Sequence, residues 1–420
     1  MKKPNLIFFL LLATTVQPAL AVQENVKGLL SEINLSESSE DVNQKKSFDS
    51  EVMITKTENR AIESLNKVIQ KRTGKPDEPD LLFRLAELYM RRAKSGRYFD
   101  LDKVSVNRLK QLGLNNQRAN DGLKQAVEIY NKMLRKFPHY PDLDYVFFNN
   151  ALANIQLKEV ELAKKNYLQL ISAFPKSELI PDTLLEVGEI YYNQQNFSAA
   201  LEKFKAIEKF PESKAYPYGL YKSAWALYNM RETDQAIQQL LLVVKQNPAD
   251  SPDPKKFNLR KESLRDLSVF VGERLAPDKI FGFFEKITSE EELGEIIYAL
   301  AGLYESHSRF KEISVFASQY INSYPKSKQT PKLYSKLIDT LETLKQRDQV
   351  LKKLSDMGDF CKSEKTELTC KEEFRKVSLE ISKKWWDIWL KNKSNQEFSA
   401  LTEKAFVNLL SLDSVTEPDS

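Results

Sequence analysis

The segment Leu184–Pro211, LLEVGEIYYNQQNFSAALEKFKAIEKFP, decides the fold. Its first half repeats apolar or small residues at intervals of three and four, which places them on one face of a helix. Its second half does the same and stops at the proline. Gly188 and Ala200 would let the two helices approach closely, with Tyr191 and Phe204 filling the space around them. Such a helix–turn–helix unit cannot bury its apolar face alone, so the sequence predicts neighbouring units that repeat it.

The unit recurs at nearly constant spacing, marked by alanines that are 37, 37 and 36 residues apart: Ala126, Ala163, Ala200 and Ala236. Weaker copies of the pattern continue to about Leu354. The composition agrees, because only 12 of 420 residues are Gly while Leu, Ala, Glu and Lys are abundant. The sequence therefore predicts an all-α solenoid of stacked helix–turn–helix repeats, with capping helices at both ends.

The first 21 residues have the features of a cleavable secretory signal. Lys2 and Lys3 form a basic start, Leu6–Ala13 is an apolar run, and Ala19–Ala21 offers small residues for cleavage. The apolar run is too short to span a bilayer comfortably, and no Cys follows the site. We therefore expect a mature chain that begins at Val22 and lies in the periplasm, with secretion as the alternative.

Several repeats end in an aromatic residue, a proline and two further residues, FPHY, FPKS, FPES and YPKS, at Pro138, Pro175, Pro211 and Pro325. With the spaced alanines, these turns resemble the tetratricopeptide repeat (TPR) superfamily over roughly Leu82–Met357. The repeat length and the export signal resemble the envelope TPR proteins of Gram-negative bacteria, including Tol–Pal-associated and outer-membrane-assembly proteins. The run LYKSAWALYN and a long insertion in the first repeat resemble, more loosely, periplasmic TPR proteins of adventurous gliding motility. This chain is shorter, with about seven repeats.

The resemblance implies a right-handed superhelix that binds other envelope proteins and has no catalytic role. The expected organisation is a signal at 1–21, a disordered segment at 22–50, a solenoid of one capping helix and four repeats at 51–248 with a basic insertion at 92–123, a linker at 249–258, further repeats at 259–357, a disulfide loop and cap helices at 358–412, and a disordered tail at 413–420. The linker is predicted from its Pro- and Asp-rich sequence. In an exported protein, the two cysteines, Cys361 and Cys370, favour an intramolecular disulfide.

The first helix of each repeat lines the concave face of a TPR solenoid. Counting from the repeat pattern places nine aromatic or amide residues of the second, third and fourth repeats on that face: Tyr145, Phe148, Tyr192, Asn193, Tyr218, Tyr221, Trp225, Tyr228 and Asn229. Aromatic rings with polar tips are good anchors for a partner, and amides can pair with a peptide backbone. Rings at this spacing are also typical of a helical core, so a groove and a core are both open interpretations.

The insertion concentrates positive charge, with nine basic and three acidic side chains between Arg91 and Lys124. It is either a solvated surface or a docking surface for an acidic partner or lipid headgroups. The docking surface would use Arg91, Arg92, Lys94, Arg97, Lys103, Arg108, Lys110 and Arg118. A tryptophan cluster at Trp385, Trp386 and Trp389 is interpreted as the core of the C-terminal cap, with an exposed patch as the alternative.

The chain has no Gly-rich phosphate loop, no HExxH and no GxSxG motif, and its two histidines fall in ordinary turns. We expect no enzyme activity, cofactor, metal or transmembrane span. A net charge of only +4 argues against nucleic acid as a partner. Two functions remain: a protein-binding scaffold of an envelope complex, with gliding-type machinery as one setting, and a solenoid receptor for a peptide or peptidoglycan-type ligand. Peripheral membrane association and the oligomeric state stay open.

Overall fold

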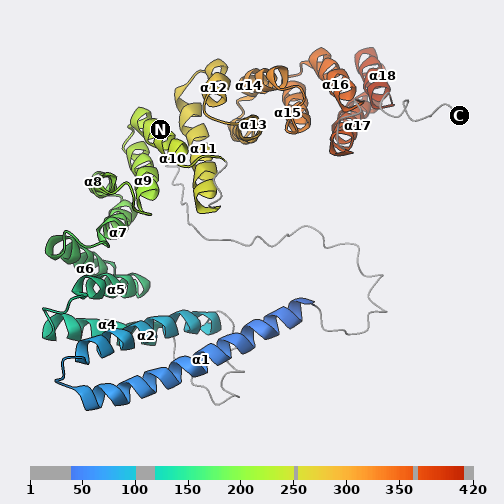
Figure 1. Ribbon diagram of the computed structural model, residues 1–420. Coiled ribbons are helices and arrows are strands. Elements are labelled where there is room, and N and C mark those ends of the chain that lie inside the picture. The colour runs from blue at the N-terminus through green and yellow to red at the C-terminus, as the bar shows by residue number, and fades with distance from the viewer. Residues whose placement is uncertain (1–38, 101–118, 250–253, 363–367, 411–420) are drawn as a thin grey trace, which may run out of the picture. The chain divides into compact units, whose positions relative to one another are not determined.

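The computed structural model describes residues 39–100, 119–249, 254–362 and 368–410. These residues form seventeen α-helices and one short 3-10 turn, η1 (Ile207–Lys209), with no strand among them (Figure 1). The predicted all-α class is thereby confirmed. Contacts divide the chain into two compact units between Tyr140 and Pro141, whereas the sequence suggested a boundary at the linker 249–258.

The first unit contains α1 (Ser39–Arg72), α2 (Glu78–Asp100) and α4 (Ala119–Lys136), with α2 packed against both of the others. The expected disorder up to residue 50 is wrong for residues 39–50, which open α1. The reason is that residues 39–72 contain neither Pro nor Gly and many good helix formers. The predicted insertion is also narrower, because residues 92–100 continue α2 and residues 119–123 begin α4. Residues 101–118 lie outside the described residues.

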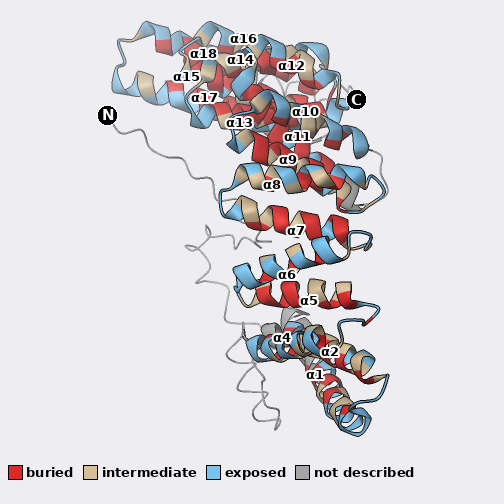
Figure 2. Ribbon diagram, turned by 90° about the vertical axis from the view of Figure 1, so that its left-hand side faces the viewer, coloured by how far each residue is buried: buried red, intermediate tan, exposed pale blue. Residues whose placement is uncertain are grey.

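The second unit is built from consecutive helices, each of which packs against the next (Figure 1). Figure 2 shows the buried residues on the faces that neighbouring helices share. The close approach expected at Gly188 is real, since a Cβ there would come within 2.3 Å of the Phe204 ring. The helices are α5 (Leu143–Gln156), α6 (Val160–Ala173), α7 (Ile180–Asn193), α8 (Phe197–Ala206), α9 (Tyr216–Asn229), α10 (Thr233–Gln246), α11 (Pro254–Arg274), α12 (Pro277–Glu285), α13 (Glu290–Ser306), α14 (Phe310–Ser323), α15 (Thr330–Thr343), α16 (Arg347–Lys362), α17 (Leu368–Lys391) and α18 (Gln396–Leu410).

The turn inside five of the helix pairs has one recurring form. In the third repeat, Gln195 adopts a left-handed φ of 60°, its N–H donates to the Tyr192 carbonyl, and the Asn196 N–H donates to the Tyr191 carbonyl. This is the Schellman arrangement, which satisfies the free carbonyls at a helix end. The left-handed position is filled by a residue other than Gly in five repeats: Lys158, Gln195, Arg231, Ser308 and Lys345.

The turn between successive pairs explains the aromatic-Pro-x-Ser motif. The aromatic carbonyl accepts from the serine N–H three residues on, as in Ser177 N to Phe174 O at 3.0 Å. Proline suits the second position of such a turn because its φ is already fixed. The serine Oγ then accepts from the N–H two residues further, at 3.2 Å for Leu179 N. The same bonds recur at Ser213 and Ser327.

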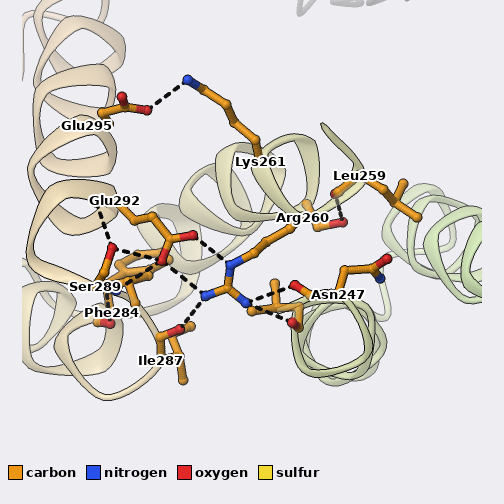
Figure 3. Close-up of polar contacts among 12 residues, drawn as sticks. Asn247, Leu259, Arg260, Lys261, Phe284, Ile287, Ser289, Glu292 and Glu295 are labelled. Atoms are coloured by element: carbon orange, nitrogen blue, oxygen red, sulfur yellow. Dashed lines mark hydrogen bonds and ion pairs between the residues drawn. The ribbon is translucent and has the colours of Figure 1, made fainter. Parts of the chain in front are cut away.

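The predicted linker is bridged by a buried arginine at the start of α11 (Figure 3). Arg260 donates to both carboxylate oxygens of Glu292 on α13, at 2.6 and 3.1 Å. Its remaining bonds go to the carbonyls of Val244 and Asn247 at the end of α10 and of Ile287 before α13. One side chain thus ties together segments on both sides of residues 250–253, which lie outside the described residues.

The last helices form the C-terminal cap. Cys361 and Cys370 are joined by a disulfide with Cα atoms 5.5 Å apart, linking the end of α16 to the start of α17. Trp385 is fully buried, and its indole N–H donates to Glu342 Oε2 of α15 at 3.0 Å. Trp386, in contrast, is 42% exposed. The tryptophan cluster therefore supplies both a core residue and a surface residue.

Candidate protein-binding surface

The nine residues that the sequence places on the first helices of repeats two to four are called here the A-helix row. They lie on α5, α7 and α9, the alternate helices of this part of the chain. Every one is half-buried or exposed, and none is fully buried. Asn193, Tyr218 and Asn229 are the exposed members.

Adjacent helices of the row are connected by polar contacts. Lys222 Nζ of α9 lies 2.7 Å from Glu189 Oε1 of α7. Asn229 Nδ2 donates to the Tyr192 hydroxyl at 2.9 Å and to the Trp225 carbonyl at 2.8 Å. These bonds hold the side chains of α7 and α9 in register along one surface.

Two aromatic tips of α9 are occupied by α11. The Tyr221 hydroxyl donates to Asp266 Oδ2 at 2.5 Å, and the Trp225 indole N–H donates to the same oxygen at 3.0 Å. Asp266 is buried, and burial raises the pKa of its carboxyl above the usual value, although both donors oppose the rise. Burial also raises the pKa of the Tyr221 phenol, with the Asp266 charge adding to the effect. Both rings therefore serve the packing of α9 on α11.

The third ring, Tyr228, continues the same contact. It stacks on Phe270 of α11 with ring centroids 4.0 Å apart, and its hydroxyl donates to Glu273 at 2.8 Å. The aromatic residues of α9 and their α11 partners both follow the helical spacing i, i+4, i+7. The carboxylates Asp266 and Glu273 were missed by the sequence reasoning. This matched spacing on the first helix of the next repeat is the signal that could have found them.

The two members of the row on α5, Tyr145 and Phe148, also contact other side chains of the protein. The Tyr145 hydroxyl donates to Glu178, and this bond, with burial a smaller contribution, raises the pKa of Tyr145 to about 12. Phe148 packs edge-on against Tyr167 with ring centroids 5.5 Å apart. The structure thus brings the row together as a mixture of packed rings and exposed amides. Binding of a partner at this row stays a prediction.

A carboxamide stands at the last helical position of three successive first helices. These residues are Gln156, Asn193 and Asn229, at the ends of α5, α7 and α9. They are spaced by one repeat, so the amides form a periodic set beside the row's aromatic residues. Carboxamides both donate and accept hydrogen bonds, which suits them to the backbone of an extended peptide.

A shallow hollow lies on α6 and is lined by Glu161, Lys164, Lys165, Leu168, Gln169 and Ser172. It does not involve the aromatic side chains of repeats three and four, which would line the closed pocket expected of a small-ligand receptor. Among the described residues, no group of three or more His, Cys, Asp or Glu side chains could hold a metal ion. No helix in the described part of the chain is long and apolar enough to cross a membrane.

The basic docking surface needs one correction. Arg92 was expected on that surface but is 1% exposed, and its Nε donates to Asn59 Oδ1 of α1 at 3.1 Å. It therefore belongs to the packing of α2 on α1. Arg91 and Lys94 are exposed as expected. The side chains of the other proposed members are not among the described ones: Arg97, Lys103, Arg108, Lys110 and Arg118. The predicted signal at 1–21 and the predicted tail at 413–420 also lie outside the described residues.

Comparison with known proteins identifies one repeat directly. A family model described as tetratricopeptide repeat matches residues 218–250, which cover α10 and all but the first two residues of α9. No curated protein matches the sequence. Four other helix pairs share the left-handed turn of the matched one. The described residues are all-α, and in the second unit they form a TPR-like stack of helix pairs in which α9 and α10 are the identified tetratricopeptide repeat.

Similar solved structures have low sequence identity to this chain. A putative kinesin light chain from Podosopora anserina, with nearly identical TPR-like repeats, is 16% identical with a TM-score of 0.35, covering 54% of this chain and 98% of that one. The C-terminal part of a TPR repeat-containing protein from Cytophaga hutchinsonii is 14% identical with a TM-score of 0.33, covering 71% and 93%. The pilF protein of Pseudomonas aeruginosa is 13% identical with a TM-score of 0.31, covering 58% and 95%.

Proposed function

We propose that this protein is a non-catalytic scaffold that binds an extended segment of another protein along the A-helix row. The observation that carries the proposal is the periodic set Gln156, Asn193 and Asn229, one carboxamide per repeat beside half-buried tyrosines. An extended peptide presents backbone donors and acceptors at regular intervals, so a periodic row of amides can bind it with little dependence on its sequence.

The bonds at Asn229 define how it would act. Its Nδ2 already donates to Tyr192 and to the Trp225 carbonyl, which fixes the amide plane. Oδ1 is then oriented to accept a backbone N–H from a ligand. Asn193 holds the equivalent position one repeat earlier and is exposed. Fixed orientation lowers the entropy lost on binding.

The proposed setting is the bacterial periplasm, in a cell-envelope complex of which gliding-type machinery is one candidate. Two features support it. The first 21 residues have the pattern of a cleavable export signal, and Cys361 is paired with Cys370 in a disulfide, which persists in oxidising compartments.

Site-specific photocrosslinking in the native cell tests the proposal. A photoreactive residue at position 193 or 229 should give the same crosslinked protein. The matched control uses Glu202 and Gln238, which are exposed, lie on the second helices of the same two repeats and have the same spacing. Equal crosslinking from both pairs would contradict a site on the A-helix row. Crosslinks at 193 and 229 to saccharide alone would favour the envelope-ligand receptor instead.

A further inference from the structure

The last helix pair has an apolar outer side. On α17, the side that packs into the chain carries Phe374, Ile381 and the fully buried Trp385. The opposite side carries Leu379, Trp386 and Leu390, which are spaced by seven and four residues and therefore share one face. Soluble proteins rarely expose contiguous apolar surface, so these side chains on one face require an explanation.

The neighbouring helix extends this surface. Val407 and Leu410 of α18 are 59% and 64% exposed, and Trp386 meets Phe406 edge-on with ring centroids 6.5 Å apart. Among the described residues, five of the fifteen large apolar side chains that are exposed fall on these two helices. We call this surface the end-face patch: Leu379, Trp386, Leu390, Val407 and Leu410. Concentrated apolar surface of this kind marks an interaction site.

The patch carries one basic and one acidic side chain that could pair across two copies of it. Lys383 lies on α17 between Leu379 and Trp386, and Glu403 lies one turn before Val407 on α18. Both side chains are exposed. A two-fold axis that lays α17 of one chain across α18 of another would pair Lys383 with Glu403 twice. A closed two-fold contact requires this kind of reciprocity.

The size of the surface also fits a dimer. α17 has 24 residues and α18 has 15, so their lengths are roughly 36 and 22 Å at the usual rise per residue, and each helix is about 10 Å wide. Their outer faces therefore offer roughly 580 Å² together, near the ~600 Å² per partner at which specific interfaces begin. Residues 411–420 contain only Leu412 and Val415 as large apolar residues beside three acidic ones, which makes them poorly matched to the patch.

We propose that the end-face patch binds the same patch of a second copy of this chain, forming a two-fold dimer through α17 and α18. Analytical ultracentrifugation of the chain from residue 22 tests this. The wild type should sediment at twice the mass of one chain. Leu390→Glu with Val407→Glu should weaken association by at least about thirtyfold, since each glutamate places a charge in apolar surface that the dimer would remove from water. Its circular dichroism spectrum should match that of the wild type, which would show that the helices are intact.

The matched control is Leu162→Glu with Leu242→Glu, because these leucines are similarly exposed on α6 and α10. It should remain a dimer. Lys383→Glu or Glu403→Lys alone should weaken the dimer, and the two together should restore it. A wild type that stays monomeric at every concentration overturns the proposal, as does a dimer that survives the Leu390 and Val407 changes. Monomers that bind phosphatidylglycerol vesicles through the same residues would overturn it in favour of a lipid surface.

Discussion

At the scale of single residues, Trp225 of the A-helix row stabilises the packing of α9 on α11, although the sequence predicted it as a contact for a partner. Trp225 is half-buried and bonded to Asp266, and its ring lies edge-on to Phe270 at 5.2 Å. Tyr218, on the same helix, is 37% exposed. Two aromatic residues seven positions apart on one helix therefore have different roles.

We predict that Trp225→Ala lowers the free energy of unfolding by about 2–3 kcal/mol, because it removes packing against Phe270 and leaves the buried Asp266 with one donor fewer. Urea denaturation followed by circular dichroism measures the change. Tyr218→Ala is the control and should stay within about 0.5 kcal/mol of the wild type. Equal effects of the two changes would mean that Trp225 is a surface residue.

At the scale of elements, the five Schellman turns each require a left-handed backbone conformation. Glycine is the usual residue for this conformation, but none of the five turns has glycine there. A left-handed residue with a Cβ carries a cost of roughly 1 kcal/mol, which is partly offset because glycine loses more chain entropy on folding. The turns are nevertheless retained in this geometry, since it satisfies the last carbonyls of each first helix.

We expect Gln195→Gly to raise the free energy of unfolding by roughly 0.5 kcal/mol, because glycine takes a positive φ without strain. Gln195→Val should lower it by about 1 kcal/mol or more, since a β-branched residue is the least suited to that conformation. Thermal melts of the two variants beside the wild type give the comparison. If valine proved as stable as glycine, the left-handed turn would be absent in solution.

At the scale of the whole second unit, Arg260 connects the helices on either side of residues 250–253 through hydrogen bonds. Its five bonds reach α10, α13 and the segment before α13. Burial alone would raise the pKa of the Glu292 carboxyl. The hydrogen bonds from Arg260 and from the Ser289 N–H outweigh burial and hold this pKa below its usual value. The guanidinium is suited to this place because it can serve several acceptors in one plane.

We predict that Arg260→Met lowers the free energy of unfolding by about 2–4 kcal/mol, since Glu292 loses its buried cationic partner and three carbonyls lose the arginine donor. Lys261→Met is the matched control: Lys261 is the exposed next residue, pairs with Glu295, and should cost no more than about 0.5 kcal/mol. Urea titrations of both variants supply the measurement. A small effect at Arg260 would mean that the two sides are joined by apolar packing alone.

The sequence by itself determined the helix pairs and their turns, because these depend on residues close together in the chain. Apolar spacing near Gly188, the aromatic-Pro-x-Ser motif and the regular alanines are all local signals. The periodicity also assigned each aromatic residue to a helix face. It placed Tyr221 and Trp225 on one face but did not separate Trp386 from Trp385, since a 3.6-residue period identifies a face without saying what lies opposite it.

Only the tertiary structure decided which faces are covered. The rings of Tyr221 and Trp225 are held by Asp266, 45 and 41 residues further along the chain, whereas Trp386 remains exposed on the last helix pair. Arg92 is enclosed by α1, although its charge predicted a surface position. The physical reason is that burial depends on which helix packs against a face, and that partner is remote in sequence.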